Sequence, residues 1–297
     1  MTAAVGVIIG TYRRPQHLQA ALASVAAQTR PPQRIFVCDD ESGDGTAGVV
    51  AQFARTSPIP VQWLSAPHTG HPGKNRNQAL AHAGDLDWVA FLDDDDRWQA
   101  SKLADQMARL DQGGVDLLGC GVTAVGPDGT VRRIYRPRAG PVRLRPLAVQ
   151  NPFATSGVIL RRQLWADLGG FNEHPRMVGW GDDYELWIRA AAAGARLENL
   201  PDPLVVYREG QGIMAARGQD LDQHAYALSV MAQALAGSGH ALARRILWGR
   251  HHAAAAEARL AAGRRGASLR HALQAVWRFP ARPSWATLAH VVKGRAG

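Results

Sequence analysis

The chain has 297 residues, a mass of 32.0 kDa, 46% hydrophobic and 20% charged residues. This length is enough to bury a large core, and the composition excludes a chain that is disordered as a whole. No run approaches the roughly 18 apolar residues of a transmembrane helix, and the first residues lack the charged head and cleavage site of a signal peptide. We therefore expect a folded, cytosolic protein.

The net charge of +9 is unevenly distributed. Residues 241–297 contain eleven Lys and Arg side chains and one acid, Glu257, which gives +10. The first 240 residues carry 23 basic and 24 acidic side chains, which gives −1. This asymmetry predicts a main domain in residues 1–218 and a basic helical extension in residues 219–297.

Residues 1–98 alternate apolar runs with helical patterns. The runs at 5–9, 34–40, 61–64 and 88–92 are typical of buried strands, and a helix is expected near 75–83. Such alternation predicts a mostly parallel sheet with helices on both faces. The first glycine-containing turn lacks the GxGxxG spacing of a dinucleotide site, which argues against a dehydrogenase.

Residues 99–218 continue with mixed elements, and the rest is helical. The expected elements are a helix at 101–110, two strands within 115–135 joined by a Pro-Asp-Gly turn, a loop, strand and helix within 151–171, a helix after 181 and a strand at 201–207. From Asp220 the chain is alanine-rich and reads as helical. Cys38 and Cys120 each lie in an apolar run without a partner at ligand spacing, and we expect buried free thiols in a reducing compartment.

Polar side chains follow three of the predicted strands. Thr11 and Tyr12 follow the first, Asp39 and Asp40 end the second, and the run Asp93–Asp96 ends the strand at 88–92. In parallel α/β sheets, ligands bind beyond the carboxyl ends of the strands. Four adjacent carboxylates repel one another, and a divalent cation held against a diphosphate is the simplest compensation. The alternative is a solvated acidic turn.

Six stretches occur in an order typical of one enzyme family. They are VIIGTYRRPQHL, VCDDESGDGT, HPGKNRNQAL, VAFLDDDDRW, TSGVILRRQLWADLGGF and GDDYELWIRAAAAG. Together they resemble the family 2 glycosyltransferases of the GT-A fold, over residues 5–210. That fold is α/β, with a Rossmann-like, mixed and mostly parallel sheet flanked by helices. The resemblance implies a metal-dependent, inverting enzyme that moves a sugar from a nucleoside-diphosphate donor to an acceptor hydroxyl. UDP is the default nucleotide, and thymidine and guanosine donors stay open.

The resemblance places the donor in residues 1–98. The nucleotide-binding positions that it implies are Thr11, Tyr12, Arg14, Asp39, Asp40, Lys74, Arg76, Asp93 and Asp94. Tyr12 would lie near the base, Asp40 would accept a hydrogen bond from it, and Asp94 is a candidate ribose contact. The family's Asp-x-Asp motif matches Asp93 to Asp95, with Asp95 as the main ligand of Mn²⁺ or Mg²⁺ and Asp93 as the second.

The acceptor half would be residues 99–218. Asp183 matches the family's catalytic base, which removes a proton from the acceptor hydroxyl. Trp180, Gly181 and Asp182 would bind the acceptor, although Trp180 is alternatively a loop anchor. Many relatives have a His or Arg after the late strand, and here Arg208 would contact the diphosphate. The acceptor itself, whether a glycan, a lipid-linked glycan or a small molecule, stays open.

Two interpretations of the basic extension stay open. Its apolar residues recur at helical spacing. They are Leu269, Leu273, Val276 and Trp277, followed by Trp285, Leu288 and Val292. They suit either an anionic membrane surface or packing on the main domain. Nucleic acid is disfavoured because no recognised binding module or aromatic platform accompanies the charge.

Two other functions fit the sequence less well than a glycosyltransferase. A sugar-phosphate nucleotidyltransferase begins with a glycine-rich, arginine-containing loop, which GTYRRP matches poorly. A non-catalytic GT-A protein that binds a nucleotide or glycan would not need both Asp95 and Asp183. His68 and His71 are alternative ligands, which we rank below the aspartates.

Overall fold

The structure is a computed structural model that describes residues 3–178, 181–209 and 220–293. It divides into two compact units, each assembled from segments that are distant in sequence. Unit 1 contains Met1–Val142, Pro152–Phe171 and Gly194–Ala216, and unit 2 contains Arg143–Asn151, Asn172–Ala193 and Arg217–Gly297. The boundary expected between residues 218 and 219 lies outside the described residues and stays a prediction.

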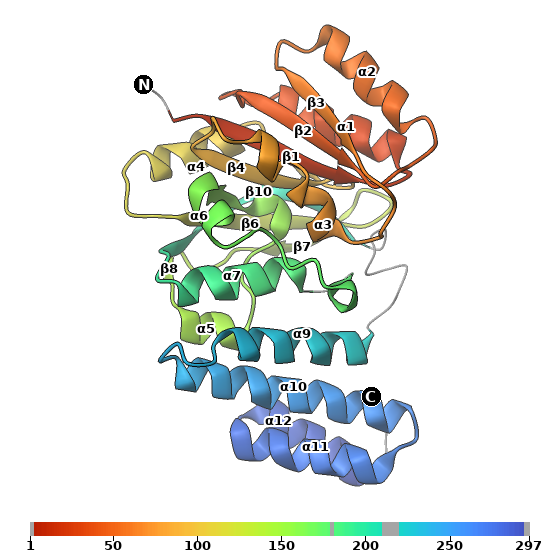
Figure 1. Ribbon diagram of the computed structural model, residues 1–297, viewed down its shortest axis with the longest axis vertical. Coiled ribbons are helices and arrows are strands. Elements are labelled where there is room, and N and C mark those ends of the chain that lie inside the picture. Colours follow the sequence, from red (N-terminus) through yellow and green to blue (C-terminus); the bar gives the residue numbers. More distant parts are fainter. Residues whose placement is uncertain (1–2, 179–180, 210–219, 294–297) are drawn as a thin grey trace. The chain divides into compact units, whose positions relative to one another are not determined.

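Unit 1 is built on one ten-stranded sheet (Figure 1). Its strands are β1 (Val5–Thr11), β2 (Arg34–Asp39), β3 (Val61–Ser65), β4 (Trp88–Asp93), β5 (Arg97–Trp98), β6 (Leu117–Val125), β7 (Val131–Tyr135), β8 (Gly140–Val142), β9 (Ile159–Arg161) and β10 (Leu197–Arg208). They lie in the order β3-β2-β1-β4-β9-β6-β10-β5, with β7 beside β6 and β8 beside β10. The strands expected at 5–9, 34–40, 61–64, 88–92 and 201–207 are all present.

The sheet is mostly parallel, as expected. Strand β1 runs parallel to β2 and β4, and β6 runs parallel to β10, whereas β9 is antiparallel to both β4 and β6. The register pairs Thr11 with Asp39 and Gly10 with Asp93. The carboxyl ends of β1, β2 and β4, and the polar residues that follow them, therefore lie at one edge of the sheet.

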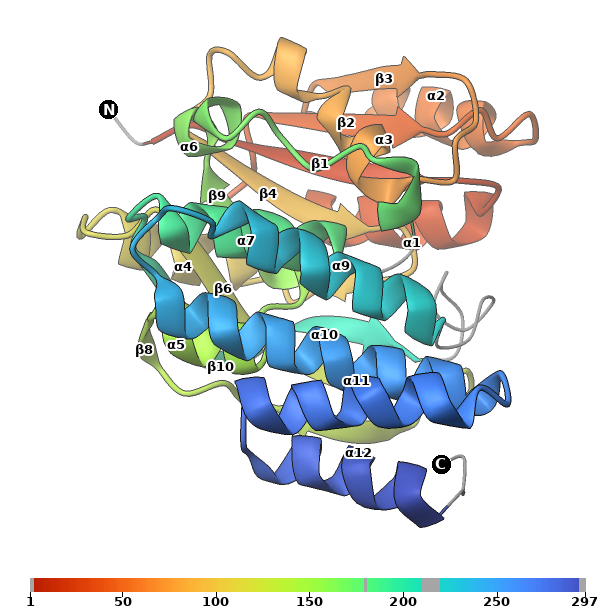
Figure 2. The same ribbon diagram turned by 60° about the horizontal axis from the view of Figure 1, so that its bottom comes forward.

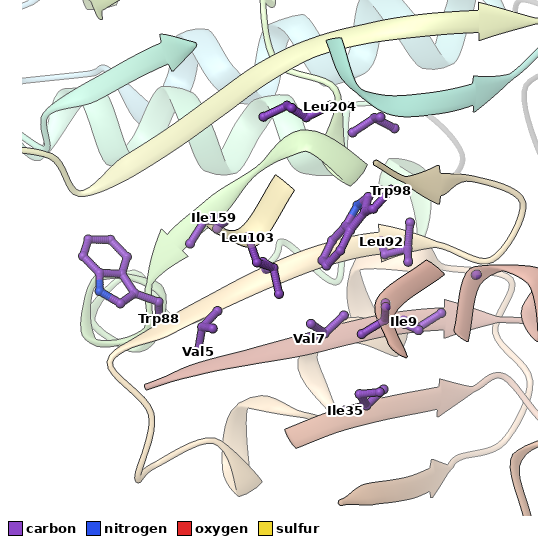
Figure 3. Packing of buried hydrophobic residues seen from close by; sticks show 14 of the residues in the cluster. Val5, Val7, Ile9, Ile35, Trp88, Leu92, Trp98, Leu103, Ile159 and Leu204 are labelled. Atoms are coloured by element: carbon purple, nitrogen blue, oxygen red, sulfur yellow. The ribbon is translucent and has the colours of Figure 1, made fainter. Parts of the chain in front are cut away.

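Helices cover both faces of this sheet. Those of unit 1 are α1 (Pro15–Ala26), α2 (Thr46–Thr56), α3 (Pro72–Asn77), α4 (Lys102–Leu110) and α6 (Arg162–Asp167), with the 3-10 turns η1 (Leu80–His82) and η2 (Thr155–Gly157). On one face, alternate strand residues such as Val7, Ile9, Ile35 and Leu92 pack against Leu103 of α4 and the apolar side of α1 (Figure 3). Burial on both faces explains why these strands read as continuous apolar runs.

The other face holds an aromatic cluster. The rings of Phe91, Trp165 and Phe171 meet edge to face, with centroids 5.3 to 6.1 Å apart. Such pairs add about 0.5–1.5 kcal/mol each beyond the burial of their area. The two cysteines are free and buried, as expected, and burial raises the pKa of Cys38 to about 12 and that of Cys120 to about 11.

The helix expected near residues 75–83 is shorter and starts earlier. Helix α3 begins at Pro72, because His71 Nδ1 accepts a hydrogen bond from the backbone N–H of Lys74 at 3.2 Å and proline suits the first helical position. It ends at Asn77, and only the short turn η1 follows. The Asn77 side chain is hydrogen-bonded to both backbone groups of Phe171, so this end of the helix is fixed to the loop after α6.

Unit 2 is helical. It contains α5 (Leu144–Val149), the 3-10 turn η3 (Pro175–Met177), α7 (Asp182–Ala192), α9 (Leu221–Ala234), α10 (Ala241–Ala261), α11 (Arg265–Arg278) and α12 (Arg282–Lys293). Helix α9 packs on α7, α10 packs on α9, and α11 and α12 pack on α10 (Figure 2). The expected helical start at Asp220 is confirmed, because its carboxylate caps α9 by accepting from Gln223 N at 3.0 Å. Among the described residues, no helix has the length and apolar character required to cross a membrane.

Candidate functional site

The loop after β1 is joined to the turn Asp93–Asp96, called the aspartate turn. Thr11 Oγ1 donates a 2.7 Å hydrogen bond to Asp94 Oδ2, and both residues are buried. The guanidinium of Arg14 lies 2.9 Å from Asp95 Oδ2 and 3.3 Å from Asp94 Oδ1. The structure thus brings together three of the predicted nucleotide-binding residues and the predicted metal ligand Asp95.

A second arginine approaches the turn from α3. Arg76 is buried, forms an ion pair with Asp93 Oδ1 and has its guanidinium carbon 5.6 Å from the centre of the Phe171 ring. Its planar, always charged group is suited to carboxylates and phosphates. The predicted basic contact Arg76 therefore lies beside the Asp-x-Asp motif.

The last aspartate of the turn has a separate role, which the sequence did not reveal. Asp96 is 1% exposed, and its Oδ2 accepts a 2.6 Å hydrogen bond from Ser156 Oγ. Its Oδ1 accepts from the backbone N–H of Arg208 at 3.1 Å. The Ser156 hydroxyl in turn accepts a 3.1 Å hydrogen bond from Asp93 N. Ser156 and Asp96 thus fix the turn and bring the backbone of Arg208, the predicted diphosphate contact, to it.

Buried side chains fix the backbone of Ser156 and Gly157. Trp98 Nε1 donates to Ser156 O at 2.7 Å, and Gln106 Nε2 donates to Gly157 O at 2.8 Å. Lys102 is completely buried, donates to Gln106 Oε1 at 2.7 Å and lies 3.9 Å from the centre of the Trp98 ring. Burial lowers the pKa of Lys102 to about 8. The position of η2 is therefore determined by the core and not by the loop sequence alone.

The aspartate turn has an excess of negative charge. Burial raises the pKa of Asp94 to about 6, although Arg14 and the Thr11 hydrogen bond lower it. Burial, and then repulsion from Asp93 and Asp94, raises the pKa of Asp95 to about 6. Burial and the charges of Asp93 and Asp95 raise the pKa of Asp96 well above its usual range. The arginines therefore offset this charge only partly, and a bound cation would lower these pKa values.

The donor set fits a hard divalent cation. Asp93 and Asp95 each give one oxygen to an arginine, which leaves Asp93 Oδ2 and Asp95 Oδ1 outside the ion pairs. Their side chains are 33% and 12% exposed. Within the described ranges, no group of three or more His, Cys, Asp or Glu side chains is arranged to enclose a metal. Mg²⁺ and Mn²⁺ at phosphate sites typically take one or two carboxylates, with water and phosphate supplying the rest.

Two strained loops line the same edge. Arg13 (φ 52°) and Glu41 (φ 57°) are the non-glycine residues with positive φ in the part of the chain that the structure describes. Ser42 fixes the first of them, since Arg13 N donates to its Oγ at 2.8 Å and Arg13 Nε donates to its carbonyl at 2.9 Å. Beside them, the Tyr12 ring stacks on His68 with centroids 4.1 Å apart. Such backbone strain concentrates at functional sites.

Asp39 and Asp40 shape these loops. Asp39 accepts hydrogen bonds from the backbone and the hydroxyl of Ser42. Asp40 accepts from Thr69 N at 2.9 Å and from Gly70 N at 2.8 Å. A carboxylate oxygen has more than one acceptor site. The contact of Asp40 with the base is compatible with this geometry and stays a prediction.

The loop histidines have structural contacts. His68 Nδ1 lies 2.9 Å from Asp40 Oδ2, and His71 is the N-cap of α3. Lys74, a predicted nucleotide contact, is exposed on that helix. Neither histidine belongs to a metal-binding group within the described ranges.

The predicted base lies in unit 2, at the start of α7. Gly181, with φ 82°, is the N-cap, and Asp182 and Asp183 form the first turn, where the helix dipole favours negative side chains. Asp182 is buried and Asp183 half-buried. The next residue, Tyr184, fixes this turn, since its hydroxyl donates to Leu147 O and accepts from Arg250 Nη1 at 2.7 Å. Trp180, the predicted acceptor contact, lies outside the described residues.

The sequence matches a known family over most of this site. The model of glycosyl transferase family 2 matches residues 6–167, more than half of the chain. The chain belongs to glycosyl transferase family 2. A model of glycosyl transferase family group 2 also matches residues 88–288. The resemblance drawn from six sequence stretches is thus confirmed, and the protein is a glycosyltransferase.

Two curated relatives illustrate this family. An uncharacterized glycosyltransferase of Haemophilus influenzae is 28% identical over 207 residues, which are 68% of this chain and 74% of the relative. The UDP-Glc:alpha-D-GlcNAc-diphosphoundecaprenol beta-1,3-glucosyltransferase WfgD of Escherichia coli is 32% identical over 106 residues, which are 36% of this chain and 40% of the relative.

Solved structures with a similar fold confirm that the chain has the GT-A fold. S. aureus TarS 1–349 in complex with UDP-GlcNAc has a TM-score of 0.71 at 20% identity, over 98% of this chain and 92% of that one. The mannosyltransferase PcManGT from Pyrobaculum calidifontis, in complex with GDP-Man and Mn²⁺, has a TM-score of 0.58 at 20% identity, over 99% and 86%.

Proposed function

We propose that this glycosyltransferase is metal-dependent and inverting, and that it uses a nucleoside-diphosphate sugar whose diphosphate binds at the aspartate turn. The single observation that carries the proposal is the convergence of Arg14, Arg76 and the turn at the carboxyl edge of β1 and β4. The phosphate groups of a donor are negatively charged and need positively charged neighbours. The aspartate carboxylates repel a phosphate unless a cation lies between them. Mn²⁺ or Mg²⁺ held by Asp95 and Asp93 satisfies both requirements.

The donor would be bound mainly by the chain's own groups. Tyr12, Asp40, Lys74 and Arg76 would contact the nucleotide, and Arg208, whose backbone N–H donates to Asp96, would contact the diphosphate. When bound, the divalent cation would act as a Lewis acid on the leaving diphosphate. A UDP-sugar is our default donor, because TarS was solved with UDP-GlcNAc and the WfgD name specifies UDP-Glc. The GDP-Man complex of PcManGT keeps a guanosine donor open.

The transfer would be a single displacement. The carboxylate of Asp183 takes the proton of the acceptor hydroxyl, and the oxygen forms a bond to the anomeric carbon. The bond from that carbon to the diphosphate oxygen breaks, and its electron pair leaves with the nucleoside diphosphate. Attack opposite the leaving group inverts the anomeric configuration. Asp182 would orient the base or the acceptor, and Trp180 and Gly181 complete the proposed acceptor residues.

We further propose a lipid-linked glycan as the acceptor. The name of the WfgD relative specifies a sugar on diphosphoundecaprenol. An enzyme with such an acceptor works at a membrane surface, so we place this one in the cytoplasm with a peripheral contact to the membrane. The hexose that is transferred and the linkage position depend on a few loop hydrogen bonds.

A turnover assay tests the proposal. Hydrolysis of UDP-sugars, and transfer to a lipid-linked glycan, would be measured with Mn²⁺ for the native protein and for Asp183→Asn. We expect metal-dependent turnover that falls by about 10²–10⁴-fold in Asp183→Asn, while UDP binding is retained, because the substitution removes the base and no nucleotide contact. Unchanged transfer by Asp183→Asn would exclude this residue as the base. Turnover that is insensitive to chelation would exclude the metal.

A further inference from the structure

Helix α11 has an inverted distribution of apolar residues. The side that packs on α10 carries the small side chains of Ser268, Ala272 and Ala275, all fully buried. The large residues Leu269, Leu273 and Trp277 recur every fourth position, so they lie along one line of the helix, and they are 39%, 52% and 70% exposed. A helix that only completes a core buries its largest apolar residues.

Helix α12 repeats this arrangement. It buries Ser284, Thr287 and Val291, and it exposes Trp285 by 54% and Val292 by 70%. These two are seven residues apart and therefore lie on one side of the helix. The sequence left open whether the large apolar residues of the extension pack within the protein or contact a membrane. The five exposed residues of α11 and α12 do not pack within the protein.

The exposed apolar residues lie in a strongly basic setting. Residues 264–293 contain six Arg and Lys side chains and no acid. Arg265 and Arg270, on α11, are exposed, and the helical period places them on either side of the line Leu269–Leu273–Trp277. Arg282 and Lys293 are exposed on α12. A second copy of this surface would bring like charges together, whereas anionic lipid would neutralise them.

The surface is also held in a fixed position on its unit. Arg245 of α10 donates to the last carbonyls of α11, to Arg278 O at 2.6 Å and to Trp277 O at 2.9 Å. Ser268 Oγ donates to Ala256 O at 2.7 Å. Gly249 allows the turn after α11 to approach α10, since a Cβ there would lie 2.4 Å from Phe279 Cβ. The apolar lines are thus presented by a packed helix pair (Figure 2).

We propose that α11 and α12 form a docking surface for an anionic lipid bilayer. The pair would lie in the interface with Leu269, Leu273, Trp277, Trp285 and Val292 among the lipid headgroups, and with its arginines beside the lipid phosphates. This deepens the proposed function, since a lipid-linked acceptor would be met at such a surface. The expected occupant of the surface is lipid and not a second copy of the chain, because two such basic surfaces would repel each other.

Vesicle binding of the full chain, without donor or metal, tests the proposal separately from catalysis. Co-sedimentation would compare vesicles of phosphatidylcholine with vesicles that contain phosphatidylglycerol. We expect binding to the anionic vesicles only, weakened by salt. Removal of one arginine, in Arg270→Gln or Arg282→Gln, should weaken binding about fivefold. Leu273→Ser with Trp277→Ser should weaken it more than tenfold, whereas Leu242→Ser, an exposed leucine of α10, should not.

A fluorescence measurement covers the case in which charge alone brings the protein to vesicles. Both native cysteines are buried, so Leu273→Cys can be labelled selectively with an environment-sensitive dye. Insertion should shift its emission to the blue on anionic vesicles, and the same dye at Ala262→Cys, which is also exposed, should not shift. Binding without a shift, equal binding to neutral vesicles, or a dimer that Trp277→Ser dissociates would each overturn the proposal. Loss of transfer in solution would bear only on the proposed function.

Discussion

Arg14 and Asp95 form a 2.9 Å ion pair between the loop after β1 and the turn after β4. Asp95 uses only one oxygen in this pair, and burial together with its aspartate neighbours raises its pKa to about 6. The single positive charge of Arg14 therefore neutralises only part of the negative charge of Asp94 and Asp95. The metal and diphosphate proposals rest on the convergence of Arg14, Arg76 and the aspartate turn, and this imbalance of charge supports them.

Replacement of Asp95 should uncouple nucleotide binding from metal. In Asp95→Asn we expect Mn²⁺ to lose its effect on UDP affinity, which in the native protein should rise at least about tenfold with the metal. Titration calorimetry with UDP, with Mn²⁺ and with chelator, measures both values. Asp111→Asn is the control, because Asp111 is exposed and pairs with Arg30 away from the turn. UDP affinity that ignores chelator in the native protein would refute the metal assignment.

Ser156 should act as a positioning residue. In Ser156→Ala, the buried carboxylate of Asp96 loses its 2.6 Å donor, which should cost about 1–3 kcal/mol of stability. Because the same hydroxyl accepts from Asp93 N, kcat should also fall about ten- to a hundredfold. Ser65→Ala is the control, because, among the described residues, the Ser65 hydroxyl makes only a long contact of 3.4 Å with an Asp39 oxygen and does not contact Asp96. Denaturant unfolding and turnover with Mn²⁺ measure the two effects, and a stability loss with unchanged kcat would leave Ser156 a structural role only.

The strands of the parallel half were predictable because their information is local. Apolar β-branched runs such as 5–9 identify buried strands on both faces, and the polar ends then follow from parallel pairing. The insertion of β9 between β4 and β6 was not predictable, because no local pattern specifies the pairing of Ala90 with Ile159. Such pairing depends on side-chain packing across the whole sheet.

The site divides in the same way. The motif Asp93–Asp95 is contiguous, so its resemblance to the family's Asp-x-Asp motif could be recognised in the sequence and predicted a metal site there. The contacts of Asp96 with Ser156 and with the backbone of Arg208 span 60 and 112 residues, and no spacing rule reveals them. In the extension, the period predicted an apolar line at Leu269 and Leu273, but a period does not say which side of a helix is covered.

Gly181 should be required for the geometry of the base. In Gly181→Ala, an ordinary side chain would occupy φ 82°, and its Cβ would lie 3.2 Å from Ala227 Cβ. Gly237→Ala is the matched control, because Gly237 has φ 74° and open space around it. Backbone strain should lower the free energy of unfolding of both variants by about 1–2 kcal/mol. The loss should be larger in Gly181→Ala, because its Cβ also meets Ala227.

Activity separates the two glycine variants further. Gly181 is the N-cap of α7, whose first turn carries Asp183, so transfer should fall in Gly181→Ala and stay at the native level in Gly237→Ala. Thermal unfolding and transfer assays measure both. Equal thermal losses would show that Ala227 yields to the methyl group, and a native rate for Gly181→Ala would show that the cap does not position the base.

Acid should weaken unit 2 through His252. Burial, with the charges of His251 and His271, lowers its pKa from 6.5 to about 4. Between these values the unfolded chain binds a proton that the folded chain does not, so this residue's contribution to stability falls as the pH drops from 7 to 5 and levels off below 4. The loss should be about 1–2 kcal/mol by pH 5, and His252→Asn should lack it.

The variant is essential because the aspartate turn has the opposite dependence. Asp94 and Asp95, with pKa values raised to about 6, bind protons in the folded state that the unfolded chain releases, so their contribution rises as the pH falls through 6. This trend is common to both proteins and cancels in their difference. Urea unfolding at pH 7, 6 and 5 should therefore show a native advantage over His252→Asn that shrinks with acid. If the stability difference between the native protein and His252→Asn did not change with pH, the pKa of His252 would not be lowered in the folded state. The 3.1 Å contact of its Nδ1 with His271 Nδ1 would then not prevent protonation of His252.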